Sequence, residues 1–465
     1  MNTFNKKSLY TAIAGLSALG VTGIAEAVHV NPDGLGQVLI YPYYTARQTP
    51  STARFPNAQY NTLLSVVNST VSAKAVKVRF LESLNSREVL DFNLYLSHND
   101  VWTAGIVPTA DGAGVVTYDK SCTTPSLTAG TVYPFVASQF SGSNADGADS
   151  SLDRTREGYI EIIEMGDIVS GSATETGVTH VSGVPPCTGL SDAVAATNTV
   201  AGSGGLFGDL TIINVNATAE TSGDATALEA FTAAPLWAVP SSIHPTLADG
   251  TVLTSETYKA GAVVTATWTT GIDAVSAAMM HDTLMNEYIL DSGTKSGTDW
   301  IVTYPTKRYY VSVGTGTPPK LFQRNFGASG ACDDVLVAFW DREEQVKAGP
   351  PPSFSPPLPG VPPSSLCYEA NVVTFNNTNV FSSKNSRNVD MGTFQNGWAR
   401  INLVGGATPP IHQLISTTGQ TFNGLPVIGF ATATFFNGTL PAVPPSTAPT
   451  QSAYGGSYRH KYTSN

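Results

Sequence analysis

The chain contains 465 residues, carries a formal net charge of −11 and has only 13% charged residues. An acidic chain is repelled by the phosphates of nucleic acids and by anionic lipids, which argues against both as partners. The hydrophobic fraction of 42% supports a packed core and excludes a chain that is disordered throughout. Its length suggests two or three domains.

The start of the chain has the pattern of a secretory signal peptide. Lys6 and Lys7 form a short basic segment, an apolar stretch follows over 9–24, and Ala25-Glu26-Ala27 has the small residues that signal peptidase cuts after. We therefore predict a cleavable signal peptide over 1–27. The mature protein is expected to be extracellular or on the cell surface, with the periplasm as the alternative.

Short segments that alternate between apolar and polar residues come next. In 73–82, Val76 and Val78 alternate with basic residues, and 88–96 repeats the pattern. Such alternation predicts antiparallel strands with one buried face, as in an Ig-like β-sandwich. We expect a sandwich-like N-terminal domain over 28–185. Its other strands are predicted over 37–45, 61–68, 100–106, 114–118 and 158–165.

Three tyrosines cluster in the first of these strands. Tyr41, Tyr43 and Tyr44 surround a proline, and such rings either stack against a sugar or pack in a core or interface. The second interpretation is favoured.

An acidic loop precedes the last strand of this half. Asp146, Asp149 and Asp153 are candidate ligands of a loose calcium site, because carboxylate oxygens suit this ion. Gly142 stands where an EF-hand-like pattern requires its first ligand, so an acidic loop exposed to solvent is the favoured alternative. No other cofactor is predicted.

A small, polar connection over 185–205 leads to a second, mostly β domain over 206–465. Apolar residues spaced as in a helix predict one prominent helix over 274–290, with Asp273 as its N-cap. His281 and Met285 would then lie one turn apart and could share a soft metal, although core packing is favoured. Prolines over 349–363 predict a loop of polyproline II character.

The mature chain contains four cysteines. An even number in an exported protein predicts two disulfides, and three pairings are open: the residues are Cys122, Cys187, Cys332 and Cys367. Pairing of nearest neighbours would close loops of moderate length within each half.

Four segments, over 30–45, 61–102, 297–311 and 424–462, are spread along most of the mature chain. Together they resemble a family of secreted, largely uncharacterised cell-surface proteins of Gram-negative bacteria. The resemblance implies an extracellular or cell-surface location and assigns no role to any residue.

No segment after the signal peptide is long and apolar enough for a membrane-spanning helix, and neither an HExxH nor a GxSxG motif occurs. We therefore predict a secreted cell-surface structural or adhesive protein whose partners are further copies of itself or other envelope components. The alternative is a secreted carbohydrate-binding protein or hydrolase whose site is built from dispersed residues.

Overall fold

The computed structural model describes residues 26–49, 58–217, 219–314, 320–347, 354–355, 364–405, 411–442, 444–445, 447 and 449–464. Residues 1–25 of the predicted signal peptide lie outside these ranges. So do 349–353 and 356–363 of the predicted proline-rich loop.

The N-terminal half begins with an eight-stranded antiparallel sheet. In spatial order its strands are β1 (His29–Val30), β15 (Thr226–Glu229), β2 (Val38–Thr45), β10 (Glu157–Ile168), β4 (Lys74–Glu82), β5 (Glu88–Leu96) and β8 (Cys122–Thr124), with β11 (Thr199–Val200) beside β10. The central strands of this sheet carry the alternating segments recognised in the sequence. Both faces of β4 are buried.

A second antiparallel sheet packs against the first. Its strands are β14 (Ala219–Asp224), β13 (Asp209–Asn214), β3 (Tyr60–Asn68), β6 (Val101–Pro108), β7 (Ala113–Val116) and β9 (Tyr133–Pro134), with β12 (Leu206–Phe207) beside β3. Phe92 of β5 meets Trp102 of β6 edge-to-face, with ring centroids 5.7 Å apart. Contacts of this kind fill the space between the sheets and make the half sandwich-like.

The C-terminal half contains two further sheets. The larger has the order β23 (Phe354–Ser355), β26 (Ser386–Val389), β25 (Ala370–Phe375), β20 (Ser296–Thr303), β31 (Ile428–Leu440) and β32 (Thr450–Arg459). The smaller has the order β22 (Leu336–Asp341), β27 (Asn396–Asn402), β19 (Thr283–Ile289) and β33 (Lys461–Thr463). Tyr288 of β19 stacks on Phe375 of β25, so the two sheets share a core.

Short elements complete the described part of the chain. Four two-stranded pairs are β16 (Thr254–Lys259) with β17 (Ala262–Thr267), β18 (Met280–His281) with β30 (Leu425–Pro426), β21 (Asp333–Asp334) with β24 (Ser365–Leu366), and β28 (Gln413–Ile415) with β29 (Thr421–Asn423). The α-helices are α1 (Ala173–Val178), α2 (Asp192–Thr197) and α3 (Gly271–Ala278). The 3₁₀ helices are η2 (Gly142–Asn144), η3 (Leu152–Arg156), η4 (Leu247–Asp249) and η5 (Lys307–Tyr309).

The structure confirms the predicted mainly β fold and shortens the predicted helix. Instead of covering 274–290, α3 ends at Ala278, and the chain continues as β18 and β19. Leu284 and Tyr288, four residues apart, fit a strand of period two as well as a helix, so their spacing does not discriminate. The N-cap is Thr270, whose hydroxyl accepts a hydrogen bond from the Asp273 backbone N–H.

The boundary between the two halves in the structure differs from the one predicted from the sequence. The sequence placed the start of the second domain at residue 206, but β12, β13, β14 and β15 all belong to the N-terminal sheets. The N-terminal half therefore extends to Glu229. The segment 185–205 is a connection within this half, and it contains α2 and β11.

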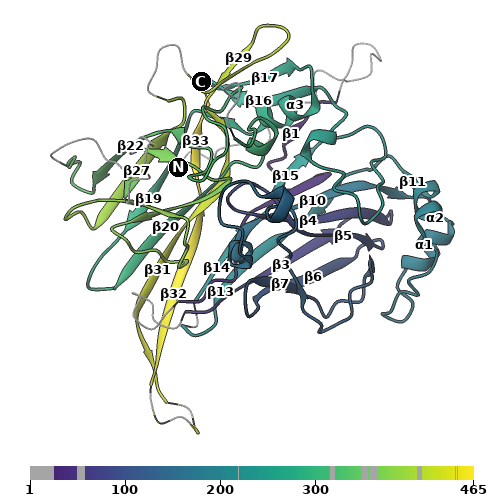
Figure 1. The fold of residues 1–465 in the computed structure, drawn as a ribbon, viewed down its shortest axis with the longest axis horizontal. Coiled ribbons are helices and arrows are strands. Elements are labelled where there is room, and N and C mark those ends of the chain that lie inside the picture. The colour runs from purple at the N-terminus through teal and green to yellow at the C-terminus, as the bar shows by residue number, and fades with distance from the viewer. Residues whose placement is uncertain are drawn as a thin grey trace, which may run out of the picture.

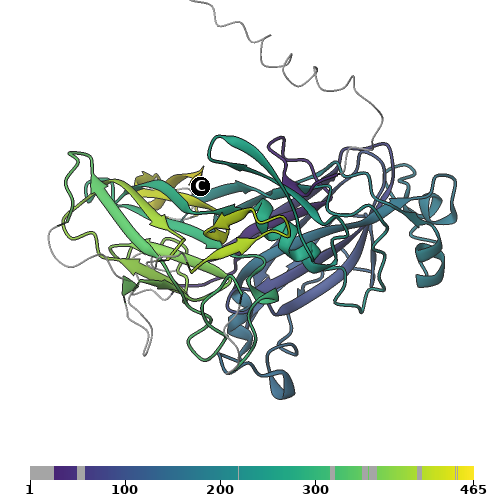
Figure 2. The same cartoon turned by 90° about the horizontal axis from the view of Figure 1, so that it is seen from above.

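The two halves lie side by side and are joined by direct contacts (Figures 1 and 2). The Thr303 hydroxyl of β20 donates to the Pro42 carbonyl of β2 at 2.6 Å. Tyr43 of β2 packs on Phe381, with centroids 5.5 Å apart. One continuous hydrophobic cluster runs through both halves. Among the described helices, none has the length and apolar character needed to cross a membrane.

Candidate functional site

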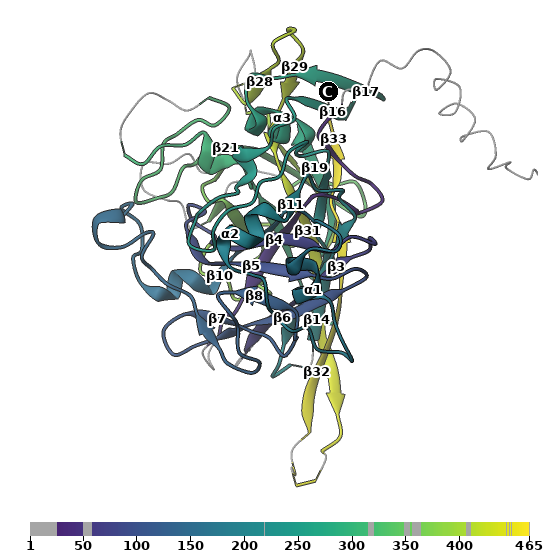
Figure 3. The same cartoon turned by 90° about the vertical axis from the view of Figure 1, so that its right-hand side faces the viewer.

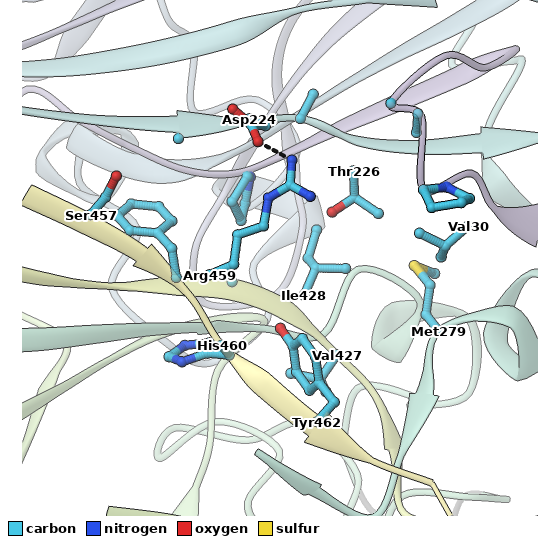
Figure 4. Close-up of a pocket in the computed structure, with 18 of the residues that line it drawn as sticks. Val30, Asp224, Thr226, Met279, Val427, Ile428, Ser457, Arg459, His460 and Tyr462 are labelled. Atoms are coloured by element: carbon cyan, nitrogen blue, oxygen red, sulfur yellow. Dashed lines mark hydrogen bonds and ion pairs between the residues drawn. The ribbon is translucent and has the colours of Figure 1, made fainter. Parts of the chain in front are cut away.

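A cavity of about 510 Å³ lies where the halves meet. Figure 4 shows β32 of the C-terminal half facing the end of β14 of the N-terminal half across it. At this point Arg459 forms an ion pair with Asp224. Both side chains are well exposed, so the pair contributes little to stability and marks the rim of the cavity.

Two histidines in the wall of this cavity are held neutral. Burial lowers the pKa of His460 and of His281 to about 4. His460 donates from Nε2 to the Ile301 carbonyl at 2.9 Å, which leaves Nδ1 to accept from the Asn286 amide at 3.3 Å. Both of its ring nitrogens are thus engaged, and His460 is a structural residue of the β32–β33 segment.

His281 is fixed in a similar way. Its ring stacks on Tyr462 with centroids 4.1 Å apart, and its Nδ1 lies 2.9 Å from the Ser464 hydroxyl. His281 belongs to β18 and Met285 to β19, so the two are not one helical turn apart as the sequence suggested. The two histidines thus add no charge to the cavity wall, whose charged lining residues are Asp224 and Arg459.

The polar face of the first sheet is covered and contains buried ion pairs. Arg79 of β4 donates to Glu161 of β10 at 2.5 Å and to Glu88 of β5 at 2.8 Å. Lys77 pairs with Asp91 and also donates to the Pro240 carbonyl at 2.9 Å. The alternating pattern placed these charges in solvent, but the ion pairs join neighbouring strands within a buried face, and the Lys77–Pro240 hydrogen bond ties this face to the segment that covers it.

The three predicted calcium ligands do not form a common site. The Asp146 carboxylate accepts from both terminal nitrogens of Arg154, at 2.9 and 2.7 Å. Asp153 pairs with Arg47 at 2.7 Å and with Lys384. In the part of the chain that the structure describes, no three His, Cys, Asp or Glu side chains are grouped so that they could hold a metal ion.

The ion pairs explain why the structure does not bring these three residues together as a set of calcium ligands. The arginine hydrogen bonds lower the pKa of Asp146 against the effect of burial, and they occupy the oxygens that a cation would need. Asp149 lies at the surface and accepts from the Ser151 backbone N–H at 2.8 Å. The loop is thus an ion-paired cover at the end of the sandwich.

The four cysteines form two disulfides, Cys122–Cys187 and Cys332–Cys367. This is the pairing of nearest neighbours among the three that the sequence left open. The first bridge ties edge strand β8 to the loop after α1. The second closes the base of the segment that contains the prolines.

Two groups of aromatic residues differ in how far they are exposed to solvent. Tyr41, Tyr43 and Tyr44 are fully buried and belong to the core, as favoured from the sequence. Trp340 of β22 and Trp398 of β27 instead lie directly opposite each other, stacked at 4.4 Å, and Trp398 is 39% exposed. The Arg400 guanidinium lies 5.2 Å from the Trp340 ring centroid.

The β31–β32 hairpin projects from the body as an arm (Figures 1 and 3). The pairing of β31 with β20 ends at Phe435–Ser296, while the pairing with β32 continues to Leu440–Thr450. At the start of the arm the Phe436 N–H still donates to the Thr294 carbonyl at 3.3 Å, and the Ala453 N–H donates to the Ala217 carbonyl at 3.1 Å. Only further out, over 437–440 and 450–452, does each strand have an outer edge with no strand partner among the described residues. At its base the half-buried Phe435 stacks on the exposed Tyr454, with ring centroids 5.1 Å apart.

The sequence around the arm is free of charged residues. No Asp, Glu, Lys or Arg occurs between Arg400 and Arg459. Proteins usually protect exposed strand edges with charges, especially lysine, and this arm has none on its strands. The absence of charged residues between Arg400 and Arg459 is visible in the sequence and could have pointed to this hairpin. The Trp340–Trp398 pair could not be found in this way, because it depends on the register between β22 and β27.

No protein-family model, curated protein or solved structure matches this chain.

Proposed function

We propose that this is an exported structural protein of the cell surface whose copies associate through the β31–β32 arm. Export is supported by the signal-peptide pattern, by two disulfides and by the finding that no described helix suits a membrane. The observation that carries the proposal is the arm itself, a projecting hairpin with open edges and no charges.

A second copy of the arm is the partner that fits best. An open strand edge presents unpaired N–H and C=O groups, and another strand can satisfy them by adding to the sheet. An arm that carried many charges would repel its copy, but this one is neutral from Phe430 to Tyr458. Prolines at 441, 444, 445 and 449 confine pairing to the strands, because proline cannot donate a backbone hydrogen bond.

The test places like charges on the arm. Asn437 and Thr439 are exposed on β31, so Asn437→Lys with Thr439→Lys should leave the core intact. We expect the wild-type mature protein to form dimers or larger assemblies in sedimentation experiments, with the double variant at least tenfold weaker in association. The matched control is Thr265→Lys, at an exposed site on β17, which should associate like the wild type.

Two outcomes would overturn the proposal. One is a wild-type protein that stays monomeric at high micromolar concentration and on vesicles or cell envelopes. The other is a lysine variant that associates as strongly as the control. Electron microscopy of wild-type assemblies would then show whether they are closed dimers or extended arrays.

A second candidate function, carbohydrate binding, is favoured by the Trp340–Trp398 pair. An exposed indole offers a flat apolar surface beside polar groups, and here Arg400 supplies hydrogen-bond donors next to the rings. Affinity electrophoresis with laminarin and xylan would test this function. Loss of retardation in Trp398→Ala, but not in the exposed-aromatic control Tyr258→Ala, would support it, and absence of retardation of the wild type would exclude these glycans.

A further inference from the structure

The residues at the predicted cleavage site are part of the folded structure. Val28 is fully buried, its N–H donates to the Thr254 carbonyl at 2.8 Å, and its carbonyl accepts from the Glu256 N–H at 2.9 Å. Ala27 is also buried, and its carbonyl accepts from Nδ1 of His29 at 2.9 Å. The Ala27–Val28 peptide bond is therefore enclosed and held on both sides.

A protease needs the residues around the bond in an accessible, extended form. Such access requires local unfolding when the segment is hydrogen-bonded and buried, as β1 and the residues before it are. Cleavage after Ala27 is consequently blocked once β1 has docked between Ser255 and β15.

A second cavity of about 510 Å³ lies beside this bond. Its wall includes Glu26, Ala27, His29, Glu229 and Glu256. His29 and Glu229 lie directly opposite each other in the β1–β15 register, so their side chains project to the same face. Burial raises the pKa of Glu229, and the charge of Glu26 acts in the same direction.

We propose that cleavage after Ala27 precedes the docking of β1 and that the new α-ammonium group of Val28 is then held in this cavity by Glu229 and Glu256. Hydrolysis adds water across the Ala27–Val28 bond, so Ala27 leaves with a carboxylate and Val28 gains a protonated amine. Glu26 leaves with the peptide. A cavity with three carboxylates thereby becomes one with two carboxylates and an ammonium group.

The proposal rests on the export part of the proposed function and is independent of the arm. The proposal predicts that the charge of Glu229 destabilises or does not affect the folded chain before cleavage after Ala27, and that it stabilises the folded chain after cleavage. In a chain beginning at Val28 this charge attracts the ammonium group, whereas in a chain that retains Glu26 it is repelled by a neighbouring carboxylate. A purely structural role of Glu229 would give the same sign in both chains.

The experiment compares a chain that begins at Val28 with one that begins at an N-acetylated Glu26, whose first residue carries no α-ammonium group, each with and without Glu229→Gln. We expect the substitution to lower the urea midpoint of the Val28 form and to raise or leave unchanged that of the Glu26 form. Glu220→Gln, at an exposed site on β14, is the control and should shift neither. A shift of the same sign and size in both forms would overturn the role of Glu229.

The order of events is tested with the full chain and signal peptidase. Precursor diluted from urea into the peptidase should be cleaved after Ala27, whereas precursor refolded beforehand should be cleaved at least tenfold more slowly. Equal rates would overturn the order. N-terminal sequencing of the exported protein should give Val-His-Val, and any other start would overturn the proposal while leaving the arm experiment unaffected.

Discussion

Arg79 of β4 and Glu161 of β10 stand directly opposite each other in the first sheet and form an ion pair at 2.5 Å in which neither side chain is more than 1% exposed. Glu88 of β5 completes the group from the other side. The pair lies on the sheet face that alternation assigns to solvent, and its burial shows that this face is an internal layer.

Removing the arginine should be costly. Arg79→Met leaves Glu161 and Glu88 buried without their ion-pair partner, and we expect a loss of about 3–5 kcal/mol in the free energy of unfolding. Replacing the whole group by Arg79→Met, Glu88→Leu and Glu161→Leu should recover most of this loss. Urea unfolding at pH 7 measures both. A single variant that costs less than about 1 kcal/mol would show that solvent reaches the pair.

The Cys122–Cys187 bridge should stabilise the N-terminal half through the unfolded state. It closes a separation of 65 residues, for which the chain-entropy model gives about 4 kcal/mol. The Cys122→Ala, Cys187→Ala variant should lose about this amount in urea unfolding without a change of secondary structure in circular dichroism. The Cys332→Ala, Cys367→Ala variant, with a separation of 35, should lose slightly less. A larger loss for the shorter loop would contradict the entropic account.

Asp299 of β20 should make the protein less stable as the pH rises. Burial raises its pKa to about 6, although the Phe381 N–H donates to its carboxylate at 3.1 Å. Because the folded pKa is above the unfolded value near 4, the stabilisation is present below about pH 4 and is lost through pH 6. Relative to the wild type, Asp299→Asn should gain about 3 kcal/mol between pH 4 and pH 7.5. An unchanged difference between the two proteins would show that folding does not shift the pKa of Asp299.

His460 should make the protein less stable as the pH falls, which is the opposite of the effect of Asp299. Burial lowers its pKa to about 4, so its contribution is present above about pH 6.5 and is lost as the pH falls to 4. The ring protons of His460 should show no titration above pH 5 in nuclear magnetic resonance spectra. His460→Gln should reduce the loss of stability between pH 6.5 and 4. Titration of His460 near pH 6.5 would mean that the β32–β33 segment opens.

Sequence patterns located the strands well, because alternation is a local property. The segments 73–82 and 88–96 closely match β4 and β5. Alternation does not reveal what lies on the second face, so the burial of Arg79 and Lys77 was missed. The covering segment comes from residues about 160 positions later, as the contact from Lys77 to Pro240 shows.

The candidate sites were harder to predict than the strands. The acidic residues of the 141–153 loop are of the type that binds calcium, but Asp146 pairs with Arg154 and Asp153 pairs with Arg47. Spacing in the sequence does not show which cation lies beside a carboxylate in the folded chain. The cysteine count predicted two bridges and left their pairing open. The arm was not predicted, because a binding or catalytic site is sought among charged and nucleophilic residues. This region has no charged side chains between Arg400 and Arg459.

The position of β15 constrains how this protein can fold during export. β15 (Thr226–Glu229) lies between β1 and β2 in the first sheet, so β1 has no sheet neighbour there until a strand almost 200 residues later has emerged. Pairings this distant give a high contact order and slow folding. Until β15 is available, the edge of β2 that β15 covers has no partner in this sheet, which leaves this early strand open to misassociation.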